Sequence, residues 1–302
     1  MIAPSGEQFE IELDDQLATV VEVGGGLRTY SVGGRAVLDG YGPEEMCTSG
    51  RGQVLVPWPN RIAGGSYEFA SRRHQLPIDE VAGNTAIHGL VRWNSWRVLE
   101  RESDRVVVGH ELHPQPGYPF ALALWIEYGL AEDGLHVTTS ATNVGDDPCP
   151  FGAGAHPYLV PGNTATIDNA VLRLPARSVL DENGLQRGWV HVEETELDFR
   201  DARPVGKTAL DHCFTGLDRD EDGRVRVTLG SELRTTTLWA DEAYPYLMLY
   251  TGDDRPDVRR RSLAVEPMTC PPQAFRSGEN VVVLEPGDSV TARWGLGRVD
   301  ES

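Results

Sequence analysis

The stretch ALALWIEYGLAEDGLHVTTSATNV, residues 121–144, decides the fold class. Every second residue in its first half is large and apolar, which is typical of a strand with one buried face: Leu122, Leu124, Ile126 and Tyr128. Ala-Glu-Asp-Gly then provides turn chemistry, and the alternation resumes at Leu135. The stretch therefore predicts a β-hairpin with one face in the core and the other toward water or a ligand.

The same period of two recurs along the chain, in residues 66–78, 96–112, 224–241 and 280–296, and each stretch predicts a further hairpin. Helical periodicity over a dozen residues is missing, and 33 glycines and 20 prolines are spread along the whole length as turn residues. No linker or repeat divides the chain. We therefore expect an all-β protein, with one large antiparallel β-sandwich domain over residues 1–302.

Composition narrows the possible partners. The net charge of −19 and the pI of about 4.8 disfavour nucleic acid and anionic membranes, so a neutral small molecule is the expected ligand. No apolar run approaches the roughly 20 residues of a membrane helix, and the N-terminus lacks the features of a secretory signal. We therefore expect a cytoplasmic protein. We expect no cofactor and no metal, and Cys47, Cys149, Cys213 and Cys270 have no metal-ligand spacing.

Five segments break the strand pattern by combining polar groups with glycine and proline. They are VPWPNRIAGG (56–65), NTAIHGLVRW (84–93), FGAGAHPYLV (151–160), LDHCFTGL (210–217) and AVEPMTCPPQAF (264–275). Together they offer arginine, histidine, aspartate and glutamate side chains in rigid local settings, with aromatic rings nearby. This set of groups is suited to holding a polyol and moving protons.

The histidine and the glutamate of these segments are the candidates for proton transfer. We expect Gly152 and Gly154 to leave space beside the imidazole of His156, so that it is presented to a ligand. Glu266 follows an apolar strand and precedes Pro267, which favours a fixed inward position. The alternatives are a turn histidine and a solvated edge carboxylate.

The motifs PWPNRI, AIHGL, GAGAHPY, LDHCF and VEPMTCPP, in this order over nearly the full length, resemble the aldose 1-epimerase (mutarotase) family. The resemblance implies the galactose mutarotase-like β-supersandwich fold and the interconversion of sugar anomers without a cofactor. It implies that Glu266 is the catalytic base and His156 the catalytic acid. It also implies that Arg61, His88 and Asp211 bind the sugar hydroxyls.

Two further residues are candidates for contact with the sugar. Asn60 precedes Arg61 in its segment. Five tryptophans are expected in the core, namely Trp58, Trp93, Trp96, Trp239 and Trp294, and of these Trp239 is the candidate for stacking on the pyranose ring. Arg61 could instead form an ion pair at the surface, and Asp211 could instead cap a turn.

Departures from the family pattern affect the expected sugar specificity more than the expected reaction. Galactose mutarotases tend to have His-Gly-Gly and His-Pro-Tyr-Phe, whereas this chain has Leu90 and Leu159 at the last positions of these motifs. Gln273 stands where the family often has asparagine. The proposed acid and base are intact.

The sequence thus predicts a mutarotase that acts on a free aldohexose, as a monomer or homodimer with a monosaccharide as its small-molecule partner. A sugar-binding module without catalysis is one alternative. A hexose-6-phosphate mutarotase is another, and it would need arginines such as Arg61, Arg72, Arg73 or Arg92 for the dianion. A glycoside hydrolase would need two carboxylates at a defined separation.

Overall fold

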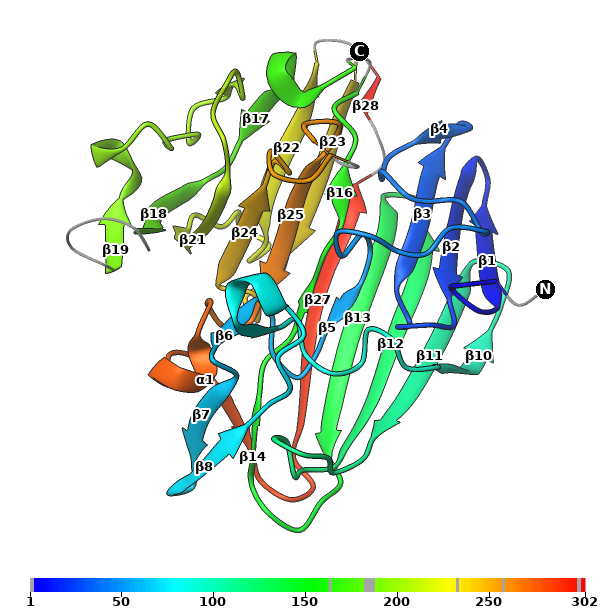
Figure 1. Ribbon diagram of the computed structural model, residues 1–302. Coiled ribbons are helices and arrows are strands. Elements are labelled where there is room, and N and C mark those ends of the chain that lie inside the picture. Colours follow the sequence, from blue (N-terminus) through cyan, green and yellow to red (C-terminus); the bar gives the residue numbers. More distant parts are fainter. Residues whose placement is uncertain are drawn as a thin grey trace.

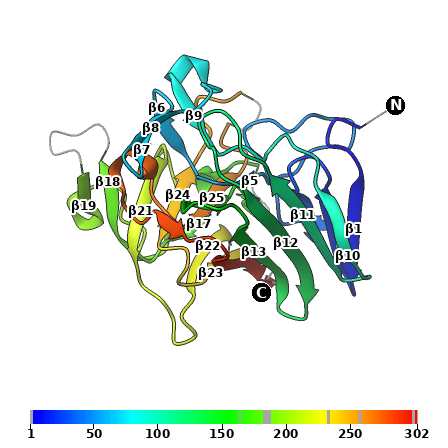
Figure 2. The ribbon, with the colours of Figure 1, turned by 90° about the horizontal axis from the view of Figure 1, so that it is seen from below.

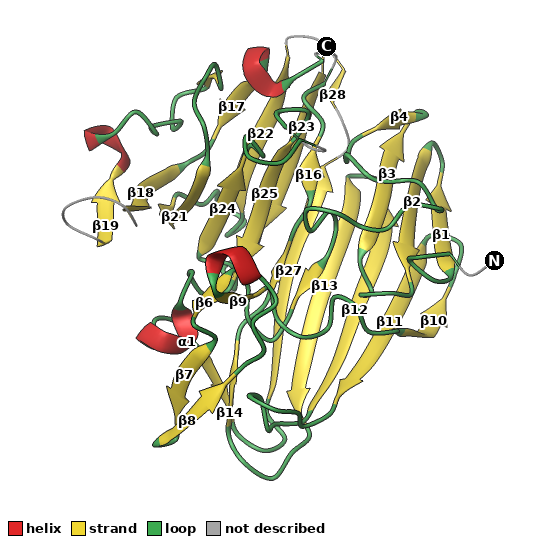
Figure 3. Cartoon of the chain, viewed as in Figure 1, coloured by secondary structure: helices red, strands yellow, loops and turns green. Residues whose placement is uncertain are grey.

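Antiparallel β-sheets make up most of the protein, as the alternation predicts. The computed structural model describes residues 3–162, 165–181, 188–231, 234–256, 259–297 and 300–301. Figure 3 shows strands throughout, with helices confined to single short turns. These helices are η1 (Val81–Gly83), η2 (Ile167–Asn169), η3 (Val192–Glu194) and α1 (Ala274–Ser277).

The largest sheet has ten strands and runs across the whole molecule (Figure 1). Its order is β10 (Arg97–Arg101), β11 (Arg105–Leu112), β12 (Leu122–Ala131), β13 (Gly134–Asn143), β27 (Ser289–Gly297), β23 (Arg234–Ala240), β22 (Val225–Ser231), β17 (Val171–Arg173) and β20 (Arg203–Pro204), and β28 (Asp300–Glu301) also pairs with β23. The side chains of Leu122, Leu124, Ile126 and Tyr128 are all buried, so the predicted core face of β12 is confirmed.

A second sheet of eight strands carries the polar segments. Its order is β19 (Gly188–His191), β18 (Ala176–Asp181), β21 (Asp211–Leu217), β24 (Tyr246–Tyr250), β25 (Leu263–Met268), β15 (Gly154–Ala155) and β5 (Val54–Leu55), and β16 (Tyr158–Leu159) also pairs with β25. All six residues of β25 are buried, because the strand lies in the middle of this sheet. The sheet faces the larger one, since β5 and β15 share a narrow internal space with Tyr128, Val137 and Trp294.

Smaller sheets complete the molecule. The strands β1 (Gln8–Leu13), β2 (Gln16–Val21), β3 (Leu27–Val32) and β4 (Arg35–Ala36) form one sheet that lies against β11 and β12. Three strand pairs are β14 (Cys149–Phe151) with β26 (Val282–Leu284), β6 (Arg61–Ala63) with β9 (Thr85–Ile87), and β7 (Ser66–Phe69) with β8 (Arg72–Gln75). Figure 1 and Figure 2 both show β6 to β9 gathered on one side of the molecule.

Four of the five predicted hairpins are confirmed, and the prediction for residues 280–296 is wrong. Its two strands, β26 and β27, do not pair with each other. β26 pairs with β14, whereas β27 lies between β13 and β23 in the large sheet. In the described part of the chain, no helix has the length and apolar character needed to cross a membrane.

Candidate active site

His156 lies just after β15, and two neighbouring segments fix its imidazole. Its backbone exchanges hydrogen bonds with the loop before β5, donating to Gln53 O at 3.1 Å and accepting from Gly52 N at 2.9 Å. The ring of Tyr158 stacks on the imidazole at a centroid distance of 5.0 Å, and the Tyr158 hydroxyl donates to Ser49 O. The imidazole is therefore 5% exposed and held in one orientation.

The glycine that makes room for this imidazole is Gly50, and the expectation for Gly152 and Gly154 is wrong. A Cβ atom on Gly152 would meet Cys270 Sγ at 2.5 Å, and one on Gly154 would meet Pro267 O at 3.0 Å. Both glycines thus permit close approach of neighbouring strands. A Cβ on Gly50 would instead lie 2.7 Å from Cδ2 of His156.

Glu266 extends from the middle of β25 toward the same imidazole. Its Oε1 atom lies 3.3 Å from His156 Nε2, and the residue is 2% exposed. Among the residues that the structure describes, Glu266 Oε2 and His156 Nδ1 have no hydrogen-bond partner. Since buried polar atoms are rarely left unpaired without a functional reason, these atoms are available for a ligand or for proton exchange.

Burial shifts both groups toward their neutral forms. Burial raises the pKa of Glu266 well above its usual value, and the nearby charge of Asp211 raises it further, while Arg61 acts in the opposite direction. Burial also lowers the pKa of His156 far below its usual value, with contributions from the positive charges of Arg92 and Arg61. Burial therefore favours an uncharged pair with one proton on Glu266. Transfer of this proton across the 3.3 Å contact gives the carboxylate and the imidazolium.

His88 and Asn60 hold each other beside this pair. The backbone N–H of Asn60 donates to His88 Nδ1 at 3.1 Å, and the backbone N–H of His88 donates to Asn60 O at 2.9 Å. Burial, followed by the charge of His156, lowers the pKa of His88 well below its usual value, so its ring is neutral. Because Nδ1 accepts a hydrogen bond, the ring proton of His88 resides on Nε2.

Arg61 forms the ion pair that its sequence allows, and it also lines the cavity. Its Nε and NH2 atoms donate to the two oxygen atoms of Glu80, at 2.8 and 3.0 Å. Its NH1 atom lies 4.0 Å from Asp211 Oδ2, and both residues line the same cavity as His88. The ion pair with Glu80 thus orients one edge of the guanidinium and leaves the other directed at Asp211.

These side chains surround one cavity of about 260 Å³. It is lined by Glu266, His156, Arg61, His88, Asn60 and Asp211, so the structure brings together all of the predicted site residues except Trp239. A larger and more open depression of about 970 Å³ lies beside β3 and β4, but neither Glu266 nor His156 lines it.

Trp239 is a core residue, which corrects its prediction as a sugar platform. Its ring lies in the ten-stranded sheet, where it packs against Gly295 and beneath the guanidinium of Arg224. It is 5% exposed and does not line the cavity. Trp93, which the sequence places in the core, is instead 47% exposed and lies at the cavity wall.

Sequence reasoning missed several further lining residues. Asp79 and Glu80 precede the AIHGL motif, Tyr250 ends β24, and Asp254 and Arg255 lie in the loop after it. The first two lie close to a recognised motif, which is a signal that could have found them. The second group contacts the cavity only because β24 lies between β21 and β25, and no local pattern carries that information.

The donor set also has the composition of a metal site. His88, His156 and Glu266 offer ligand atoms that lie within 4.8 Å of one another, and two imidazoles with one carboxylate suit a divalent transition metal. The same three groups are sufficient for acid and base chemistry, in which a carboxylate and an imidazole exchange protons with a bound hydroxyl.

An all-β sandwich whose cavity holds a buried carboxylate beside an imidazole is the arrangement that the resemblance to the mutarotases predicts. The sequence model of one family, aldose 1-epimerase, matches residues 8–296. The chain therefore belongs to the aldose 1-epimerase family, and it is an isomerase of that family.

Relatives and solved structures resemble the chain over nearly its whole length. The chain is 37% identical over 287 residues to the uncharacterized protein YihR of Escherichia coli K12, covering 94% of this chain and 90% of that protein. It is similar in fold to galactose 1-epimerase from Lactobacillus acidophilus, with a TM-score of 0.79, 22% identity, and coverage of 97% and 94%. An aldose epimerase homologue from Caenorhabditis elegans gives a TM-score of 0.84 at 17% identity, with coverage of 98% and 99%. The predicted galactose mutarotase-like fold is confirmed.

Proposed function

We propose that this protein interconverts the α and β anomers of a free aldohexose, with Glu266 as the base and His156 as the acid. The observation that carries the proposal is the 3.3 Å separation of Glu266 Oε1 and His156 Nε2 in the cavity. The anomeric hydroxyl and the ring oxygen of a pyranose are bonded to the same carbon. An acid and a base that serve both oxygens must therefore lie close together.

The reaction follows from one proton passing in each direction. The Glu266 carboxylate removes the proton of the C1 hydroxyl while protonated His156 donates to the ring oxygen, so the C1–O5 bond breaks and an aldehyde forms. Glu266 is then protonated and His156 is neutral, which is the state that burial favours. Rotation about C1–C2 presents the other face of the aldehyde. Reclosure returns both protons and gives the opposite anomer.

The remaining polar groups hold the sugar while it opens. Neutral His88 offers an Nε2 proton, Arg61 offers NH1, and Asp211 offers two acceptor oxygens. Trp93 presents an apolar surface at the cavity wall. Donors and acceptors on opposite sides suit the hydroxyl groups of a hexose, each of which can donate and accept.

The charges in the cavity favour a neutral sugar over a hexose 6-phosphate. Three arginines line it, but Arg61 is paired with Glu80 and Arg92 with Asp79. Arg72 and Arg73 lie on β8 and do not line the cavity. Five carboxylates also face the same space: Asp79, Glu80, Asp211, Asp254 and Glu266. A phosphate dianion would meet more negative than positive charge there.

Polarimetry on freshly dissolved sugar tests the proposal. Purified protein is expected to accelerate the change in optical rotation of α-D-glucose or α-D-galactose above the rate in buffer. Glucose 6-phosphate, measured in parallel, is expected to respond less. Decay at the buffer rate for every common aldohexose would contradict the proposal, and a preference for the phosphate would correct its substrate.

A further inference from the structure

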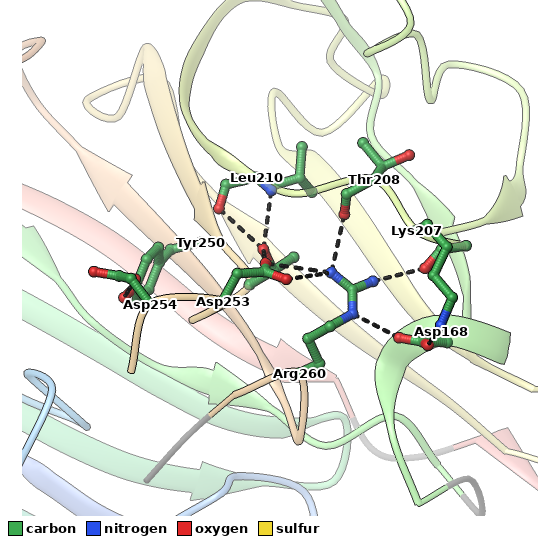
Figure 4. Close-up of polar contacts among 10 residues, drawn as sticks. Asp168, Lys207, Thr208, Leu210, Tyr250, Asp253, Asp254 and Arg260 are labelled. Atoms are coloured by element: carbon green, nitrogen blue, oxygen red, sulfur yellow. Dashed lines mark hydrogen bonds and ion pairs between the residues drawn. The ribbon is translucent and has the colours of Figure 1, made fainter. Parts of the chain in front are cut away.

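The guanidinium of Arg260 is buried in a cluster of acceptors outside the sugar cavity (Figure 4). Its Nε atom donates to Asp168 Oδ1 at 2.6 Å, and its NH2 atom donates to Gly206 O at 2.6 Å. Its NH1 atom donates to Thr208 O and to Asp253 Oδ1, both at 3.2 Å. All three nitrogens are thus used, and the side chain is only 11% exposed.

These contacts join three segments that are distant in sequence. Asp168 lies in η2, Gly206 and Thr208 lie in the loop before β21, and Asp253 lies in the loop after β24. Arg260 itself precedes β25 and has a left-handed backbone, with φ of 50°. Its backbone N–H donates to Thr251 O at 3.0 Å, which folds the β24 to β25 connection back on itself.

A second layer of hydrogen bonds leads from this cluster to the cavity wall. The hydroxyl of Thr251 donates to Asp253 and accepts from the backbone N–H of Leu210 at 2.9 Å. The backbone N–H of Thr251 donates to Leu210 O at 2.9 Å. The hydrogen bonds from Arg260 through Asp253 and Thr251 end at the backbone of Leu210 (Figure 4). Leu210 directly precedes Asp211 in the chain.

Asp211 depends on this backbone support because its own side-chain contacts are weak. In the described part of the chain, its carboxylate has an ion pair with Arg61 at 4.0 Å, and the side chain is 54% exposed. Such a contact contributes little to holding a side chain in one place. The location of Asp211 is set by its register with Tyr250, the last residue of β24.

We propose that Arg260 is a positioning residue for the sugar-binding wall formed by Asp211 and Tyr250, and this inference rests on the proposed function. Arg260 does not line the cavity and does not touch the sugar. Glu266 and His156 are held separately, by the buried strand β25 and by the Gln53 and Tyr158 contacts. The residue therefore acts on sugar binding and leaves the proton-transfer step intact.

The test compares Arg260→Gln with Arg260→Lys and with Arg261→Gln. Arg261 is the adjacent residue, and it donates two hydrogen bonds to Asp39, away from the sugar cavity. Arg260→Gln is expected to raise KM for the aldose about tenfold with kcat nearly unchanged, on the scale of coupling between residues in one network. The KM of Arg260→Lys, which keeps the charge, should lie between those of the wild type and Arg260→Gln. If Arg260→Gln does not fold, Arg260→Lys replaces it in the test. Arg261→Gln should match the wild type.

A double-mutant cycle with Asp211→Asn distinguishes positioning from general stability. If Arg260 acts through Asp211, the effect of Arg260→Gln on KM is expected to shrink at least threefold once Asp211 has been replaced. Fully additive effects would overturn the proposal, as would a fall in kcat without a change in KM.

Hydrogen exchange provides a readout that does not depend on activity. The amides of residues 206–211 and 250–255 are expected to exchange faster in Arg260→Gln than in wild type or Arg261→Gln. Unchanged exchange in these segments would overturn the positioning role even if the enzyme is active. A wild-type protein that accelerates no aldose would instead contradict the proposed function, and exchange would still decide whether Arg260 orders the wall.

Discussion

Gly50 lies against the imidazole of His156, the proposed acid, and leaves no room for a side chain there. A Cβ atom on Gly50 would come within 2.7 Å of His156 Cδ2 and 3.0 Å of Nε2. Gly50 also has φ of +73°, a backbone conformation that side chains disfavour. On the other side, the Tyr158 ring prevents the imidazole from moving away.

Replacing Gly50 should therefore damage catalysis more than stability. Gly50→Ala is expected to displace Nε2 from Glu266 and to lower kcat about 10²-fold, the usual range for losing one proton-transfer group. Gly223→Ala is the matched control, because its φ of +78° is similar but a Cβ there would meet nothing within 4 Å. Equal kcat values in the two variants, measured by polarimetry, would contradict the steric role.

Glu266→Gln should abolish proton abstraction while preserving the fold. Glutamine fills the same volume in β25 and remains uncharged, as the buried carboxyl is when protonated. We expect kcat to fall roughly 10²- to 10⁴-fold, with sugar binding by calorimetry retained. Glu68→Gln, an exposed substitution on β7, should leave the rate unchanged. An active Glu266→Gln variant would remove Glu266 from the role of base.

The dependence of the rate on pH follows from the proton shared by Glu266 and His156. The active form holds one proton on the pair, and a second proton is added only below the lowered pKa of His156. Activity should thus persist below pH 6.5, the usual pKa of histidine. It should fall as pH rises through the raised pKa of Glu266, where the shared proton is lost. Enzymatic rates corrected for buffer catalysis would contradict this if they declined on acidification through 6.5.

The tautomer of His88 is a direct consequence of the Asn60 contact. Because Asn60 N–H donates to Nδ1, the ring proton of His88 should reside on Nε2. Imidazole ¹H–¹⁵N correlation spectra, assigned with His88→Gln, are expected to show this neutral tautomer. A proton on Nδ1 would exclude the proposed donation from Nε2 to the sugar. Loss of this donor in His88→Ala should raise KM about tenfold.

The sequence predicts local features of this fold better than distant ones. The hairpin of residues 121–144 is visible because its strands are neighbours and their alternation continues through one turn. Residues 280–296 have the same alternation, but β26 pairs with β14, more than 130 positions earlier in the chain. Period-two patterning identifies strands and does not identify partners, so that pairing could not be read from it.

The residues of the candidate site also divide into those that the sequence reveals and those that it does not. Glu266, His156, Arg61, His88, Asp211 and Asn60 lie in motifs that mark them, and the structure brings them to one cavity. Gly50 and Trp93 acquire their places through packing against distant segments. The sequence left Trp239 between the core and the sugar, because an aromatic residue in an alternating strand does not reveal which face its sheet buries.

β25 holds Glu266, the proposed base, among six consecutive buried residues, where substitutions disturb the core. Asn60, Arg61, Asp211 and Trp93 lie instead at strand ends and turns. Directed evolution toward another sugar should therefore succeed by randomising these peripheral positions, since the chemistry would survive each change of selectivity. Libraries built on β25 would mostly yield insoluble protein.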